Sequence, residues 1–93
     1  MAEKKTINRE FKVLNAYGLH ARPAALIVKA AGKYSSDIFI GKKGLEVSAK
    51  SIMGLLTMEG HQGSMINVRI VGVDAEEALA EIQELFEKKF FEE

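Results

Sequence analysis

The sequence contains no cysteine, and it has no net charge and no long apolar run. Without cysteine the chain forms neither disulfides nor thiolate metal sites, and two histidines alone predict no zinc site. The 13 basic and 13 acidic residues cancel, so an overall basic field for nucleic acid is absent. No apolar run approaches the roughly 20 residues that cross a bilayer, and no secretory segment is seen. We therefore expect a cytoplasmic protein with no metal, no cofactor and no membrane insertion.

The chain has 93 residues, enough for one domain with one hydrophobic core. We expect this domain to cover residues 1–93, with the polar segment 1–5 frayed. A chain this short rarely encloses a deep substrate pocket. The functional site is therefore expected at the surface, where a partner protein supplies its other half.

Apolar periodicity predicts four strands and three helices. The strands are expected at 6–14, 37–41, 45–48 and 65–71, and the helices at 20–31, 52–58 and 74–90. The second and third strands form a hairpin in which Leu45 and Val47 are predicted to face inward. Asp74 with Glu77 three residues later predicts a capping box at the last helix. This order indicates an α/β two-layer (α+β) fold, with a mainly antiparallel four-stranded sheet covered by helices on one face.

The stretch 18–25 places His20 at the start of the first predicted helix. Proline is tolerated in the first helical turn, so Pro23 indicates that the helix begins at or beside His20. Unpaired amides there, such as those of Ala21 and Arg22, can bind an anion at the positive end of the helix dipole. A neutral imidazole is a good nucleophile, and a guanidinium suits phosphate oxygens. These residues could form a reversible phosphoryl acceptor. On spacing alone, a surface or capping histidine beside a solvated arginine fits this very short pattern at least as well.

The segment Gly18-Leu19-His20-Ala21-Arg22-Pro23-Ala24 resembles the phosphorylation signature of the HPr family, the histidine phosphocarriers of the bacterial phosphoenolpyruvate-dependent sugar phosphotransferase system. The block Ala49-Lys50-Ser51-Ile52-Met53-Gly54-Leu55 resembles the serine-site segment of the family, and the similarity runs from Thr6 to Phe86. The resemblance implies an open-faced β-sandwich. It also implies that enzyme I phosphorylates His20 on Nδ1, that Arg22 steadies the phosphate, and that an enzyme IIA component then receives it.

A docking surface and a control point are implied by the same resemblance. The docking residues would be Ala25, Lys29, Ile52 and Met53. In many family members an HPr kinase/phosphorylase modifies the serine that Ser51 matches, and the added charge would weaken partner binding. Ser51 can also be only a helix cap, because serine is a common capping residue.

Two positions depart from the usual family pattern. Tyr17 stands where a small or polar loop residue is common. Glu59 stands where a glycine commonly ends the second helix, and Gly60 follows one place late. The family pattern therefore does not predict the geometry of that helix end. His61 is interpreted as a loop residue, because no arginine or helix start accompanies it.

Three functions fit these observations. The first is a monomeric phosphocarrier, which is a transfer intermediate rather than a free-standing enzyme. The second is a regulatory HPr paralogue whose phosphorylation state controls binding to transcription factors or enzymes. The third is an unrelated two-layer module that binds RNA or a small ligand. The zero net charge and the lack of clustered aromatic residues on a strand disfavour this third function.

Overall fold

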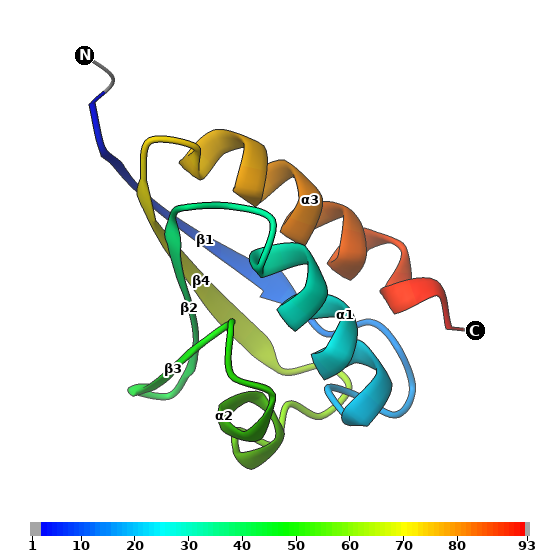
Figure 1. Ribbon diagram of the computed structural model, residues 1–93. Coiled ribbons are helices and arrows are strands. Elements are labelled where there is room, and N and C mark those ends of the chain that lie inside the picture. Colours follow the sequence, from blue (N-terminus) through cyan, green and yellow to red (C-terminus); the bar gives the residue numbers. More distant parts are fainter. Residues whose placement is uncertain (1–2, 93) are drawn as a thin grey trace.

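Four strands form one antiparallel sheet, in which the first strand pairs with the fourth, the fourth with the second, and the second with the third (Figure 1). The computed structural model describes residues 3–92. Its strands are β1 (Lys5–Lys12), β2 (Asp37–Lys42), β3 (Leu45–Ser48) and β4 (Met65–Gly72), and its helices are α1 (Ala21–Ala31), α2 (Ile52–Thr57) and α3 (Ala75–Glu87), followed by a short turn, η1 (Lys89–Phe91). The helices lie on one face of the sheet, which confirms the predicted two-layer, open-faced architecture.

The core lies between the sheet and the helices. The inward positions of β4 are Ile66, Val68 and Ile70, all fully buried as their alternation predicts. Burial of each such side chain contributes about 1.5–3 kcal/mol. On the helical side, the buried residues are Ala24, Ile27, Ala30 and Ala31 from α1 and Ala75, Ala78, Ile82, Leu85 and Phe86 from α3. The two long helices are thus fixed against the sheet, and α1 carries His20 at its start.

The prediction that Leu45 faces inward is wrong, because this side chain is 51% exposed. Its partner in the prediction, Val47, is half-buried and packs against the core. The strand β3 is only four residues long and lies at the sheet edge. At such an edge the first residue lies beyond the cover of the helices, so alternation alone does not place it in the core.

The predicted capping box at α3 is also wrong. The Asp74 side chain makes no cap to its own helix. It accepts hydrogen bonds from the Ser36 hydroxyl and, at 2.9 Å each, from the amides of Ser35 and Ser36. These hydrogen bonds lower the pKa of Asp74, and the bond from the Ser36 hydroxyl contributes most. Asp74 therefore ties the start of α3 to the loop that precedes β2.

Both ends of the chain differ in detail from the expected segments. β1 begins at Lys5, which pairs with Gly72 of β4, so this part of the segment 1–5 belongs to the sheet. The Lys5 amine also lies 2.9 Å from the Glu76 carboxylate. Met1 and Ala2 lie outside the described residues. α3 ends at Glu87 rather than at Phe90, because the three residues of η1 take positive φ angles of 53°, 54° and 59°. The last turn therefore folds back instead of continuing the helix.

Candidate functional site

His20 is the N-cap residue of α1, with an extended backbone at φ −84° and ψ −166°. The first intrahelical hydrogen bond runs from the Ala24 amide to the His20 carbonyl at 3.0 Å, and Pro23 lies buried in the first turn. The predicted helix start is therefore confirmed. Among residues 3–92, the amides of Ala21 and Arg22 have no backbone acceptor, and the His20 side chain does not cap them. These two amides are free to bind an anion.

The His20 ring makes one hydrogen bond within the described part of the chain. Its Nε2 lies 2.8 Å from Oε2 of Glu92. The Tyr17 ring lies beside it in a T-shaped arrangement, with the ring centroids 6.1 Å apart and the planes at 86°. The His20 side chain is 40% exposed and Tyr17 is 80% exposed. A partner protein can therefore reach the imidazole.

Arg22 lies at the start of the same helix and is exposed. Its side chain has no hydrogen bond or ion pair with any other residue between 3 and 92. An unpaired guanidinium keeps all of its forked donors available for phosphate oxygens. The structure thus places Arg22 where the sequence predicts it, two residues after His20 and without an internal role.

Two loops meet directly behind His20. Gly18 has a φ of 68°, and the amide of Leu19 donates to the Gly60 carbonyl at 2.7 Å. A Cβ added at Gly18 would overlap that carbonyl oxygen, so only glycine allows the approach. Glu59 has a φ of 54°, the conformation that the missing glycine would adopt freely. The end of α2 therefore keeps a left-handed residue at this place, although the residue is a glutamate.

Ser51 is the N-cap of α2, as predicted. Its Oγ accepts a hydrogen bond from the Gly54 amide at 3.2 Å, and the residue is exposed. The helices α1 and α2 pack against each other, which brings the predicted docking residues onto neighbouring elements (Figure 1). The exposed apolar side chains of α2 are Ile52 (38%), Met53 (67%) and Leu56 (37%). Leu56 was not among the predicted docking residues. The other two predicted docking residues, Ala25 and Lys29, are exposed on α1.

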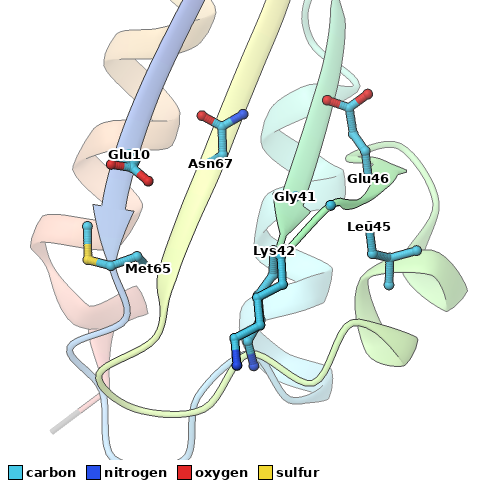
Figure 2. Close-up of a pocket in the computed structure, with 9 residues that line it drawn as sticks. Glu10, Gly41, Lys42, Leu45, Glu46, Met65 and Asn67 are labelled. Carbon is cyan, nitrogen blue, oxygen red and sulfur yellow. The ribbon is translucent and has the colours of Figure 1, made fainter.

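A hollow on the sheet face that the helices leave open lies apart from these residues (Figure 2). Its lining includes Glu10, Lys42 and Asn67, and none of its residues is a predicted site residue. Nearby, Arg69 donates to both carboxylate oxygens of Glu46 at 3.0 and 2.7 Å, which lowers the pKa of Glu46. On this face Arg69 and Glu46 pair with each other, whereas Lys42 donates to the backbone carbonyl of Glu59. Within residues 3–92, no group of three or more candidate ligands could hold a metal ion, and no helix is long and apolar enough to cross a membrane.

Comparison with known proteins decides the family. The family model described as "PTS HPr component phosphorylation site" matches residues 7–88. The chain belongs to the HPr family. The HPr phosphocarrier of Xylella fastidiosa is 42% identical over 87 residues, covering 94% of this chain and 98% of that protein. The HPr-like protein Crh of Halalkalibacterium halodurans is 41% identical over 83 residues, covering 89% and 99%.

Solved HPr structures have the same fold. A crystal structure of HPr from Thermoanaerobacter tengcongensis is 43% identical, covers 98% of both chains and has a TM-score of 0.84. A crystal structure of an HPr dimer from the same organism is 47% identical, covers 81% of this chain and 86% of that one, and has a TM-score of 0.75. The HPr resemblance read from the segment around His20 is therefore confirmed, and with it the assignment to the phosphotransferase system.

The sequence of this HPr family member does not reveal two residues of the site. Glu92 lies 72 positions from His20, and no local pattern marks it as a partner. Asn15 reads as an ordinary loop residue, yet it is 1% exposed and donates to Glu92 Oε1 at 3.0 Å. Both contacts form because the fold brings the segment that follows α3 close to the loop that precedes α1. Spacing along the sequence does not predict them.

Proposed function

We propose that the protein is a phosphocarrier that accepts a phosphoryl group from phosphorylated enzyme I on Nδ1 of His20 and passes it to enzyme IIA sugar-permease components. The observation that carries this proposal is the position of His20 at the N-cap of α1, beside two amides without acceptors. Arg22 stands on the same turn with its guanidinium unpaired among the described residues.

The chemistry follows from these neighbours. A phosphoryl group on His20 would bring negative charge to the positive end of the α1 dipole. The amides of Ala21 and Arg22 would donate to its oxygens, and the Arg22 guanidinium would add a permanent positive charge. Among residues 3–92, His20 lies at the surface at the start of α1, with its side chain 40% exposed, rather than inside an enclosed pocket. The protein therefore acts as a transfer intermediate and depends on its partners for the rest of each reaction.

Incubation with enzyme I and phosphoenolpyruvate tests the proposal. We expect an acid-labile, base-stable phosphoprotein, and we expect His20→Ala to lose it entirely. His61→Ala is the matched control, because the second histidine lies in an exposed loop. Wild-type protein that stays folded and takes up no phosphate would refute the function. In Arg22→Ala we expect slower transfer with unchanged thermal stability, since an exposed arginine contributes little to folding.

We further propose that Ala25, Lys29, Ile52 and Met53, joined by Leu56, form the docking surface for enzyme I and enzyme IIA. Ser51 adjoins this surface and would be the regulatory phosphorylation site for an HPr kinase/phosphorylase. Negative charge there would lie among apolar docking residues and would weaken binding. We expect Ser51→Asp to raise the KM that enzyme I shows for this protein as its substrate, whereas Ser51→Ala should leave that KM unchanged. Equal kinetics for the two variants would contradict this role.

A regulatory HPr paralogue is the second candidate, favoured by the similarity to the Crh protein. Such a protein would bind a transcriptional regulator or an enzyme according to its phosphorylation state. Transfer from the phosphorylated protein to an isolated enzyme IIA domain separates the two candidates, because only the carrier passes the group on. We also propose a cytoplasmic location and a monomer. Light scattering on the purified chain tests the monomer against the dimer seen for one similar HPr.

A further inference from the structure

The carboxylate of Glu92 lies between His20 and Asn15. Its Oε2 is 2.8 Å from Nε2 of His20, and its Oε1 accepts a hydrogen bond from Nδ2 of Asn15 at 3.0 Å. The Glu92 side chain is 11% exposed, whereas that of His20 is 40% exposed. The carboxylate is thus shielded from water while the imidazole remains open to a partner.

A left-handed turn brings Glu92 to this place. The preceding residues Lys89, Phe90 and Phe91 have φ angles of 53°, 54° and 59°, which residues with a Cβ rarely adopt. Phe90 is buried and packs against Phe86 with the ring centroids 5.0 Å apart. Three consecutive residues in this conformation persist only where surrounding contacts hold them, and such strain is frequent at functional sites.

Asn15 holds the carboxylate from the other side. Its two amide hydrogens go to the Gly18 carbonyl at 2.8 Å and to Glu92. Its own oxygen, Oδ1, is buried without a partner among the described residues. Buried polar groups are normally paired, and an apolar side chain at this place would leave no orphan acceptor. The asparagine is explained if its amide serves to hold the Glu92 carboxylate.

We propose that Glu92, held by Asn15, is a positioning residue that keeps the proton of His20 on Nε2 and so leaves the lone pair of Nδ1 free to attack phosphorus. A carboxylate only accepts hydrogen bonds, so the ring nitrogen that faces it must carry the proton. The inference rests on the proposed function, because it explains which nitrogen of His20 reacts.

The transfer step balances with this proton in place. The Nδ1 lone pair forms the new bond to phosphorus as the bond from phosphorus to the donor atom of enzyme I breaks. The electron pair of the broken bond returns to the donor, and the Nε2 proton stays where it is. The positive charge that the ring gains then faces the Glu92 carboxylate, which stabilises it.

Glu92→Gln tests the inference in the full chain. The two side chains have nearly the same shape, but glutamine can either accept or donate, so it selects neither tautomer. Long-range ¹H–¹⁵N spectra of the unphosphorylated protein at about pH 9, where an ordinary histidine is neutral, report which ring nitrogen carries the proton. We expect the Nε2–H to Nδ1–H ratio of His20 to exceed that of His61 by about tenfold, and to fall to the His61 value in Glu92→Gln.

The matched control is Glu87→Gln, because Glu87 is exposed and its carboxylate accepts only from Gln83 among the described residues. This control should keep the wild-type ratio, and Asn15→Ala should lower it. With enzyme I, Glu92→Gln should also slow phosphorylation by about tenfold, because a neutral glutamine does not stabilise the positive charge that the His20 ring gains. A His20 ratio that is unchanged in Glu92→Gln refutes the positioning role. Failure of the wild-type protein to accept phosphate refutes the proposed function instead, and the tautomer measurement does not depend on that outcome.

Discussion

Gly18 makes the closest backbone approach behind His20, and replacing it with alanine separates two physical effects. Its φ of 68° disfavours any Cβ, which by itself costs about 1–2 kcal/mol. The added Cβ would also overlap the Gly60 carbonyl oxygen and lie 3.1 Å from the Gly60 carbonyl carbon. Overpacking of this kind costs about 1–3 kcal/mol. Gly18→Ala should therefore destabilise the protein by about 2–5 kcal/mol.

Substitutions at three other glycines separate the cost of the positive φ angle from the cost of the overlap of the added Cβ. Gly44 has a φ of 86° with open space around it, so Gly44→Ala should lose only about 1–2 kcal/mol. Gly72 has no positive φ, but an added Cβ would overlap the Ser36 hydroxyl and lie 2.6 Å from the Ser36 Cα, so Gly72→Ala should show the overpacking alone, about 1–3 kcal/mol. Gly32 has a φ of −66° and no contact under 3.4 Å, and its alanine variant should be neutral or slightly stabilised.

Urea unfolding followed by circular dichroism measures all four variants. At a slope of about 2 kcal/mol per molar urea, Gly18→Ala should lower the midpoint by roughly 1–2.5 M. A domain of this length has a stability of roughly 5–15 kcal/mol, so the variant should still fold in buffer. Its phosphorylation by enzyme I should nevertheless slow, because the loop that carries His20 must move away from Gly60. If Gly18→Ala is no more destabilising than Gly44→Ala, the close approach is not what requires glycine.

Three further predictions concern the rest of the molecule. The Ser36 hydroxyl lowers the pKa of Asp74, so the carboxylate stabilises the fold above its unfolded pKa of about 3.9, and this stability is lost as the pH falls further. Asp74→Asn should therefore melt at a lower temperature than wild type at pH near 7. The difference between the two melting temperatures should disappear in acid when melting is measured as a function of pH. The hydrogen bond to Glu81, together with burial, raises the pKa of Tyr34 to about 12. In a variant that keeps only this tyrosine, Glu81→Gln should return the pKa of Tyr34 toward about 10, as measured by absorbance titration. An unchanged titration curve would exclude the hydrogen bond to Glu81 as the cause. Glu59→Gly should stabilise the protein by about 0.5–1 kcal/mol in urea, since glycine relieves the φ of 54°, whereas a loss would mean that the side chain has a role of its own.

The sequence predicts best what depends on local periodicity. The alternation in β4 places Ile66, Val68 and Ile70 in the core, and Pro23 locates the start of α1. The capping box fails for a physical reason, because donors from a loop 38 and 39 residues away compete successfully for the Asp74 carboxylate. Propensity describes what a side chain can do near its own backbone. It does not include the distant donors that the fold brings to the same carboxylate.

The proposed phosphoryl-acceptor site shows the same division between local and tertiary contacts. Its anion-binding half is local, since the two free amides and Arg22 follow directly from where α1 begins. Its other half is tertiary: the Phe11 ring stacks on Phe86 with the centroids 5.1 Å apart, and Phe86 contacts Phe90. These contacts hold the segment 90–92 beside the loop that precedes His20, where Glu92 accepts from Asn15. A short motif can therefore point to His20 as the proposed nucleophile. The contact of its Nε2 with Glu92, on which the proposed choice of reacting nitrogen depends, exists only once the first strand and the last helix have packed together. Variants at the end of the chain should accordingly change the reactivity of His20 without changing the motif itself.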